Sequence, residues 1–322
     1  MATPKTPANV AYGSSTVFST AEEARATYDV IAKHEDVKEI DTARFYGDSE
    51  KWIGELGLAE KYKITTKAPT INPGQSKEAI LSGAKESLKL LRVDRVAVFL
   101  LHAPDISTPF ADQMEAVQQL YLEGRFEKFG ISNFSPAQVQ EIHAIASSKG
   151  YVLPTVYQGS YSLLSRNLEH ELFPILRSLS IAFQAYAPIA GGFLVKTPEF
   201  IANPPDGGRW DRKTIVGRMY HGAFNKPEII KYLEEYIQLS ELTGLGQAEL
   251  AYRWVRFHSI LDGAKGDSII VGASSPVQLD QTLSFVEKGP LSEAVVGKLE
   301  AMWETVKDVA PHHDTMLNGF LS

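Results

Sequence analysis

Residues 96–102 read VAVFLLH, a short run that stays apolar until its last residue. Helix-like patterns flank it on both sides, at 77–91 and 110–123. An apolar run of this length, with no polar alternation, is typical of a strand that is covered on both faces of a parallel sheet. The stretch therefore predicts one strand of an alternating α/β fold, and the histidine at its end needs an explanation.

The same alternation of short apolar runs and amphipathic stretches continues along the chain. Further strands are expected at 13–18 (a weak run), 39–41, 63–67, 128–132, 154–158, 180–187 and 267–274. Further helices are expected between them, among others at 21–33, 136–149 and 227–242. Thr20 and Ser135, the latter followed by a proline, suit helix N-termini. Eight strand–helix repeats predict one domain, residues 1–322: an α/β protein with a single (β/α)8 TIM-type barrel, a C-terminal helix and long loops at the C-terminal rim.

An open, doubly wound α/β sheet is the alternative architecture. Its glycine-rich dinucleotide fingerprint belongs in the first strand–helix turn, where this sequence has none. The nearest match, GLGQAE at 244–249, lacks the third glycine and follows no strand. We interpret that stretch as the end of one helix and the start of the next.

Composition excludes several functional classes. The 322 residues carry a net charge of −7, which argues against a general nucleic-acid binder. The sequence contains no cysteine, so disulfides, thiolate metal sites and cysteine nucleophiles are excluded. Neither a signal-peptide pattern nor a run of about 20 apolar residues occurs. We therefore expect a cytoplasmic protein without a membrane segment.

Polar residues stand at the ends of the expected strands, where a core strand would not place them. They are Asp41, Lys67, His102, Ser132 and Asn133, Gln158, Tyr186, and Gly272 followed by Ser274 and Ser275. Taken singly, each has a structural explanation, such as a helix cap or a solvated strand end. In a closed parallel barrel all of them meet at one rim, where active sites of this fold lie. Together they predict a functional site.

Three of these residues, Asp41, Lys67 and His102, form a set suited to proton transfer together with Tyr46, which stands five residues after Asp41. Tyrosine is a weak acid with a pKa of about 10, and a nearby cation such as Lys67 is expected to lower the pKa of Tyr46. Asp41 would keep Lys67 charged and oriented, and a neutral His102 could orient a carbonyl group. Reduction of a carbonyl needs this chemistry, because the oxygen gains a proton while the carbon gains a hydride.

No side chain supplies a hydride, so a nicotinamide cofactor is expected. The amides of Asn133 and Gln158 suit a carboxamide, Tyr186 offers a flat face, and the glycines of 187–194 allow close approach to a pyrophosphate. A zinc hydrolase is the competing interpretation. Because the eight histidines are scattered and only His102 ends a strand, we expect no metal. His312 belongs to a stretch, His-His-Asp at 312–314, that is interpreted as a solvated turn.

Residues 190–226 are the exception to the regular alternation. Clusters of glycine and proline interrupt this segment, and no clear periodicity emerges. A long irregular loop inside a compact domain is usually functional. We expect it to close over cofactor or substrate, with Trp210 and Phe224 as candidate substrate contacts, although Trp210 could equally anchor the packing.

Several long motifs resemble the aldo-keto reductase superfamily, in its order and spacing. They are DTARFYGDSE, ITTKAP, FLLHAPD, FGISNF, VYQGSYSLLSR, AYAPIAGGFL and IIVGASSPVQLDQTL. The stretches LPTVYQGSYS, ELFPILR and KGDSIIVGASSPVQLDQTLSFVEKGPLSEAVV are similar to the aflatoxin-aldehyde reductase branch in particular.

This resemblance implies a (β/α)8 barrel that binds NADPH and reduces aldehydes and some ketones. By motif, Tyr46 would donate the proton, Asp41 and Lys67 would tune it, and His102 would orient the carbonyl. The cofactor contacts implied by the resemblance are Ser132, Asn133, Gln158, Tyr186, Gly191, Gly192, Leu194, Lys196, Gly272, Ser274, Ser275, Gln278, Gln281 and Thr282. The branch also suggests a homodimer.

Three departures from the family pattern matter. Gly272 and Gln278 stand where many relatives carry a basic pair, so the residues alone do not choose NADPH over NADH. Lys196 replaces the last glycine of the pyrophosphate loop, and we expect it near phosphate. Arg44 stands where the branch usually has an apolar residue; it is either a solvated rim residue or a ligand for an acidic substrate.

The leading hypothesis is an NADP-dependent oxidoreductase acting on small carbonyl compounds. The alternative is a cofactor-binding, redox-sensing regulatory protein on the same barrel, similar to channel-associated β subunits. The complete set of Asp41, Tyr46, Lys67 and His102 favours the enzyme, although regulatory relatives can retain it.

Overall fold

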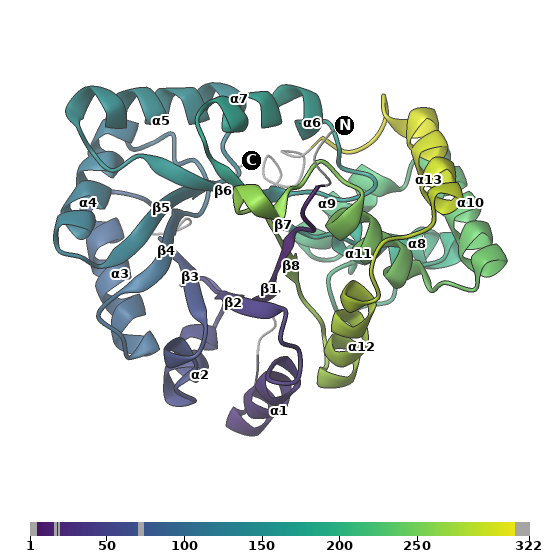
Figure 1. Cartoon of the computed structure of the whole chain (residues 1–322), viewed down its shortest axis with the longest axis horizontal. Helices are drawn as coiled ribbons and strands as arrows, with labels where there is room; N and C mark the ends of the chain where they lie inside the picture. The colour runs from purple at the N-terminus through teal and green to yellow at the C-terminus, as the bar shows by residue number, and fades with distance from the viewer. Residues whose placement is uncertain (1–4, 16–17, 19, 70–73, 313–322) are drawn as a thin grey trace.

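In the computed structural model, eight parallel strands close into a barrel whose helices lie outside it (Figure 1). The structure describes residues 5–15, 18, 20–69 and 74–312. Each strand pairs with the next in sequence, and β8 pairs with β1. The strands are β1 (Asn9–Gly13), β2 (Val37–Asp41), β3 (Lys63–Lys67), β4 (Val96–Leu101), β5 (Phe126–Ser132), β6 (Pro154–Ser160), β7 (Ala182–Tyr186) and β8 (Ser268–Val271). The predicted (β/α)8 architecture is confirmed.

Helices connect successive strands. The first half of the chain contains α1 (Ala21–Ile31), α2 (Ser49–Glu55), the 3₁₀ turn η1 (Leu58–Glu60), α3 (Lys77–Leu91), α4 (Phe110–Leu122), α5 (Pro136–Lys149), α6 (Leu168–Glu171) and α7 (Phe173–Ser178). The second half contains η2 (Ala190–Val195), α8 (Pro198–Ala202), α9 (Ile215–Phe224), α10 (Pro227–Thr243), α11 (Gln247–Phe257), η3 (Gly263–Lys265), α12 (Pro276–Glu287) and the C-terminal α13 (Glu293–Val306).

The predicted helix starts follow from side-chain caps. Ser135 forms a full capping box with Gln138, with Pro136 at the first position of α5. Thr20 accepts a hydrogen bond from the backbone of Glu23 at the start of α1. The stretch GLGQAE spans the end of α10 and the start of α11, as expected.

Two sequence-based expectations are wrong. The first strand lies at Asn9–Gly13, before the weak run at 13–18, of which residues 16 and 17 lie outside the described residues. Within NVAYG, the four residues after Asn9 are buried. This short strand pairs with both of its neighbours, β2 and β8. Residues 190–226 are also more regular than expected, because they contain η2, α8 and α9. The glycines of α9 had obscured its helical pattern.

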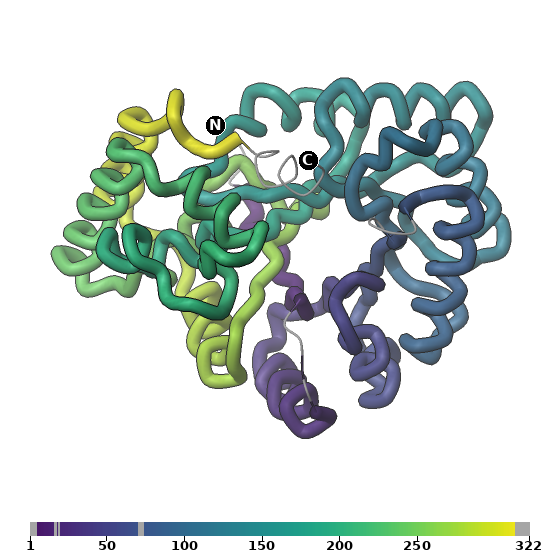
Figure 2. The backbone as a smooth tube through the Cα atoms, turned by 180° about the vertical axis from the view of Figure 1, so that it is seen from behind, coloured from purple at the N-terminus to yellow at the C-terminus, as the bar shows by residue number. Residues whose placement is uncertain are grey.

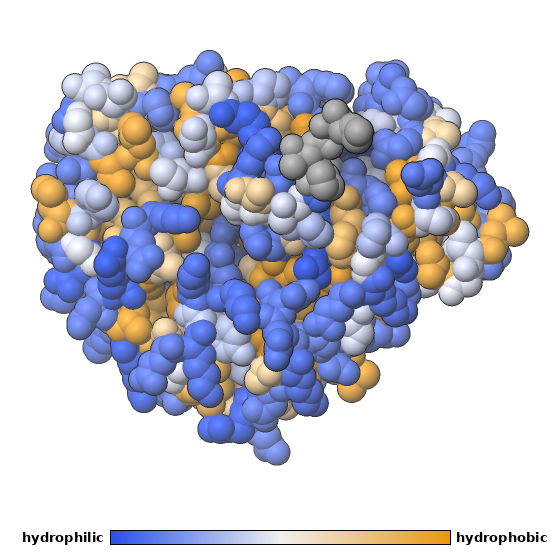
Figure 3. Space-filling view, in the orientation of Figure 1, coloured by the Kyte–Doolittle hydropathy of each residue, from blue (hydrophilic) through white to orange (hydrophobic). Residues whose placement is uncertain are grey.

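The helices after β7 gather on one side of the barrel. Figures 1 and 2 both show α8, α9, α10 and α13 there, with α13 alongside α10. The face in Figure 3 is mainly hydrophilic, with hydrophobic residues in small scattered groups. The large apolar cluster is therefore enclosed between the strands and the helices. No helix within the described ranges is long and apolar enough to cross a membrane.

Candidate active site

A cavity of about 860 Å³ opens at the C-terminal ends of the strands. The parallel register brings these ends together, as in the pairing of Ser132 with Gln158 and of Ser160 with Tyr186. The residues predicted for the site that line the cavity are Asp41, Tyr46, His102, Ser132, Asn133, Gln158, Tyr186, Gly191, Gly192, Lys196, Trp210, Phe224, Gly272, Ser274 and Gln278. The strand-end pattern thus located the cavity.

Lys67 lies beneath the cavity floor and reaches it through Asp41. Its Nζ donates to both carboxylate oxygens of Asp41, at 2.7 and 2.8 Å, and to the carbonyl oxygen of Thr42 at 2.8 Å. The Lys67 side chain is fully buried. A buried ammonium is stable only when its hydrogens are paired, and here all three are.

Tyr46 and His102 stand above this ion pair. Their rings meet edge to face, with centroids 5.8 Å apart. The Nζ atom of Lys67 lies 4.9 Å from the centroid of the Tyr46 ring. A hydroxyl, an imidazole and a buried cation are therefore close together on one side of the cavity.

Burial sets the protonation of this group. It lowers the pKa of His102 to about 3, with the Lys67 charge as a second cause, so the imidazole is neutral near pH 7. Burial and the Asp41 charge raise the pKa of Tyr46 above its ordinary value. The expected lowering of the Tyr46 pKa by Lys67 is wrong for this structure. Burial is the largest cause of the rise, and the Asp41 carboxylate, which is paired with Lys67, raises the pKa further.

Asn133 is held by three hydrogen bonds at the end of β5. It adopts a positive φ of 67° and donates through Nδ2 to the His102 carbonyl oxygen and to the Ser132 hydroxyl. Its Oδ1 accepts from the Tyr186 hydroxyl at 2.7 Å. Oδ1 keeps a second lone pair, so Asn133 can still accept from a bound amide.

Gln158 is buried at the bottom of the cavity. Its Nε2 donates to Asp41 Oδ1 at 2.8 Å and to Gln184 Oε1 at 3.1 Å. Both hydrogens of the amide nitrogen are thereby used, and Oε1 is the remaining polar atom of the side chain. Gln184 and its partner Glu39 were not singled out in the sequence, because they point inward from the middle of strands.

The turn after β7 exposes its backbone to the cavity. Gly191 and Gly192 have positive φ values of 65° and 95°. A Cβ on Gly191 would lie 2.0 Å from the Tyr220 ring, so only glycine fits there. Lys196 lines the same part of the cavity, with Nζ 4.3 Å from the Phe200 ring centroid. These residues make a concave backbone surface with one cation beside it.

The loop after β8 contributes Gly272, Ser274 and Gln278 to the lining. Gln278 Oε1 accepts from the backbone and the hydroxyl of Ser274, both at 2.8 Å. Four predicted contacts are not among the described residues of the lining: Leu194, Ser275, Gln281 and Thr282. Leu194 is buried in the core, Ser275 caps α12, Thr282 is buried, and Gln281 is exposed.

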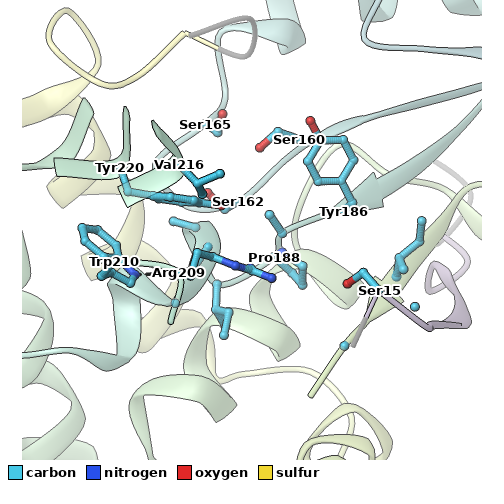
Figure 4. A pocket seen from close by; sticks show the side chains of 18 of the residues that line it. Ser15, Ser160, Ser162, Ser165, Tyr186, Pro188, Arg209, Trp210, Val216 and Tyr220 are labelled. Atoms are coloured by element: carbon cyan, nitrogen blue, oxygen red, sulfur yellow. Dashed lines mark hydrogen bonds between the residues drawn. The ribbon is translucent and has the colours of Figure 1, made fainter. Parts of the chain in front are cut away.

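Arg44, for which the sequence left open a solvated rim position or a role in binding an acidic substrate, is not among the described residues that line the cavity. Its guanidinium lies 3.6 Å from Glu50 and 3.5 Å from Glu86. Arg209, a basic residue within the irregular segment at 190–226, lines the cavity. In Figure 4 its guanidinium points between Tyr220 on one side and Pro188 on the other.

Trp210 and Phe224 line the cavity and also pack against the segment that carries it. Phe224 stacks on Phe193 with centroids 4.8 Å apart, and the Trp210 indole donates to the Gly191 carbonyl oxygen at 3.3 Å. Both side chains are buried. Trp210 and Phe224 therefore stabilise the turn after β7 and also form part of the cavity wall.

The lining also contains residues that the sequence did not point to. Ser160 is the last residue of β6, Ser162 and Ser165 follow the strand, and Phe45 is an exposed aromatic next to Tyr46. His312, interpreted as part of a solvated turn, lies at the cavity and contacts Glu171 at 2.7 Å; residues 313 and 314 are outside the described chain. Within the described ranges, no group of three His, Cys, Asp or Glu side chains could hold a metal ion.

Comparison with known proteins agrees with this geometry. The Aldo/keto reductase family matches residues 9–304. "Oxidoreductase sirO" of Leptosphaeria maculans is 41% identical over 91% of this chain and 89% of its own length. "Aflatoxin B1 aldehyde reductase member 4" of Homo sapiens is 39% identical over 85% of this chain and 87% of its own. "Aflatoxin B1 aldehyde reductase member 2" of Rattus norvegicus is 37% identical over 86% and 79%.

The match spans all eight strands and every residue group described at the cavity except the segment after α13. The chain belongs to the aldo/keto reductase family of oxidoreductases.

Proposed function

We propose that this protein reduces aldehydes, and some ketones, to alcohols with NADPH. The observation that carries the proposal is the buried Lys67–Asp41 pair beneath Tyr46, with a neutral His102 at its side. This arrangement offers a carbonyl oxygen two hydrogen-bonding groups, the Tyr46 hydroxyl and the His102 ring. When bound, the nicotinamide supplies the hydride.

The residues present fit such a cofactor. The cavity of about 860 Å³ lies within the usual size range of ligand and cofactor sites. Ser132, Asn133 and Gln158 would hold the carboxamide, and the ring of Tyr186 would lie against the nicotinamide. Gly191, which admits no Cβ, would allow the pyrophosphate to approach the backbone.

Lys196 would contact a phosphate, and Gly272, Ser274 and Gln278 would border the adenosine end. Leu194, Ser275, Gln281 and Thr282 do not line the cavity, so their side chains are not proposed as cofactor contacts. Their part would be limited to backbone contacts or to supporting the elements that carry the other residues.

In this proposal Tyr46 is the proton donor. Its raised pKa keeps the hydroxyl protonated, and a developing oxyanion within hydrogen-bonding distance would receive that proton. The neutral His102 would orient the carbonyl without competing as an acid. The buried charges of Lys67 and Asp41 would act on the Tyr46 and His102 side chains from a fixed position.

The test is cofactor binding followed by turnover. NADPH and NADH are titrated separately into the protein by calorimetry, and oxidation of the preferred cofactor is then followed by absorbance with an aromatic aldehyde. Tight NADPH binding with aldehyde-dependent oxidation supports the proposal. Binding without turnover on any carbonyl compound would indicate the regulatory alternative, and no binding would contradict both.

A further inference from the structure

A chain of buried polar side chains continues below the cavity, inside the barrel. It runs from Gln158 through Gln184 to Glu39, which also accepts from the Thr65 hydroxyl. Gln158 and Gln184 are register partners in β6 and β7 and are 3% and 4% exposed. None of these bonds is needed to close the barrel, because the strand ladders do that. These side-chain hydrogen bonds therefore have a function other than closing the barrel.

The hydrogen bonds in this chain have one direction. Glu39 Oε1 accepts from Thr65 and, at 2.7 Å, from Gln184 Nε2. Glu39 Oε1 accepts from Gln184 Nε2, so the Gln184 amide has its nitrogen towards Glu39 and its oxygen towards Gln158. Gln184 Oε1 then accepts from Gln158 Nε2 at 3.1 Å. The direction set at Glu39 is thus transmitted to Gln158.

At the upper end of the chain, Asp41 Oδ1 takes the second hydrogen of Gln158 Nε2, at 2.8 Å. With its nitrogen turned down into the barrel, the Gln158 amide has only its oxygen left for the cavity. An amide that was free to flip would present oxygen or nitrogen with little preference. An acceptor at this place is complementary to an N–H donor of a ligand.

We infer that Glu39 and Gln184 are positioning residues that, together with Asp41, fix the orientation of the Gln158 amide, so that Gln158 Oε1 accepts a hydrogen bond from the NH₂ group of the nicotinamide carboxamide. The inference rests on the proposed function, since it concerns how the proposed cofactor is recognised. It assigns to one buried residue, Gln184, and one partly buried residue, Glu39, an effect on which nicotinamide ring is bound, although neither lines the cavity.

The test compares two cofactors that differ in one group. NADP⁺ carries a carboxamide, whereas its 3-acetylpyridine analogue carries a methyl ketone and cannot donate a hydrogen bond. Dissociation constants for both are measured by calorimetry, without turnover. The wild type is expected to bind NADP⁺ about fivefold more tightly, the usual worth of one buried hydrogen bond.

Three variants then locate the origin of this discrimination. Gln184→Met removes one of the two acceptors for Gln158 Nε2 while keeping the side-chain length, and should lower the ratio of the two constants, because only Asp41 then orients the amide. Glu39→Gln should lower the ratio to an intermediate value, because Gln184 is then free to flip. The double variant should match Gln184→Met, since Glu39 acts only through Gln184.

Gln113→Met is the matched control. Gln113 is another fully buried glutamine, and its Nε2 donates to the carbonyl oxygens of Asp105 and Thr108, away from Gln158. This variant should lose stability and keep the wild-type ratio, which separates orientation of the amide from general loosening of the barrel.

Each outcome is decisive. A wild type that binds neither cofactor contradicts the proposed function and this inference together. A wild type that binds both equally well, or Gln184→Met and Glu39→Gln variants that keep the wild-type ratio, would overturn the inference alone. A Glu39→Gln effect that persists in the Gln184→Met background would also overturn it.

Discussion

Lys67 and Asp41 form an ion pair inside the barrel, with side chains that are 0% and 5% exposed. The pair joins the ends of neighbouring strands β2 and β3 directly beneath the Tyr46 ring. Burial lowers the pKa of Lys67, and the charge of Asp41 is the main cause acting in the opposite direction. Lys67 therefore depends on Asp41 for its charged state.

Breaking this pair should cost both stability and activity. Lys67→Met leaves the Asp41 carboxylate buried and uncompensated, which typically costs about 3–5 kcal/mol. Urea unfolding monitored by fluorescence measures this loss. The double variant Lys67→Met with Asp41→Asn should recover much of the stability and none of the activity. Full activity in either variant would show that the pair is structural only.

The neutral state of His102 predicts a pH dependence of stability. The pKa of His102 is about 3 when folded and about 6.5 when unfolded, so between these values the unfolded chain binds the extra proton. Stability is therefore fully present above pH 6.5 and falls as the pH falls towards 3. The loss is at most about 1.4 kcal/mol per pH unit, and less where water in the cavity reaches the ring.

Urea unfolding of the wild type and of His102→Gln at pH 7, 6 and 5 measures this dependence. The variant should lose less stability than the wild type over the same interval, since it lacks the titrating ring. Parallel curves for the two proteins would show that His102 titrates normally in the folded state.

Gly191 and Gly192 should respond differently to alanine. A Cβ on Gly191 would lie 2.0 Å from Tyr220, whereas one on Gly192 would find its nearest neighbour, Trp210, at 3.8 Å. Both substitutions impose the cost of a positive φ, about 1–2 kcal/mol. Only Gly191→Ala should also displace Tyr220 and weaken NADPH binding by about tenfold or more. Equal NADPH affinities in the two variants, measured by calorimetry, would contradict close approach of the pyrophosphate to the Gly191 backbone.

Arg209 and Arg44 provide a matched pair for substrate charge. Arg209 lines the cavity, whereas Arg44 is occupied by Glu50 and Glu86 outside it. Arg209→Met should lower kcat/KM for an aldehyde that carries a carboxylate by about 10- to 100-fold relative to its neutral analogue. Arg44→Met should leave this preference unchanged. The reverse result would favour Arg44 as the ligand for an acidic substrate.

The sequence predicted the parts of the site that lie at strand ends. Runs such as KITTK at 63–67 stop at a polar residue, and parallel pairing then brings those residues to one rim. Fifteen of the predicted positions, among them Asp41, Tyr46 and His102, line one cavity. These positions could be found because strand length and polarity are local properties of the chain.

The parts that sequence reasoning missed depend on three-dimensional packing. Arg209 follows two glycines in a loop without periodicity, so its direction is decided by Trp210 and Tyr220 packing beside it. Glu39 and Gln184 are polar residues within strands whose inward direction appears only once the barrel closes. The rise in the Tyr46 pKa likewise depends on burial, which residue types alone do not reveal.

The central claim is that Tyr46 donates the proton in an NADPH-dependent carbonyl reduction. The most direct measurement is NADPH oxidation with an aromatic aldehyde, for wild type and Tyr46→Phe, together with the NADPH dissociation constant of each. The account predicts turnover in the wild type, a loss of at least about 100-fold in kcat for the variant, and NADPH affinity unchanged within about twofold. A Tyr46→Phe variant that reduces the aldehyde at the wild-type rate would contradict it.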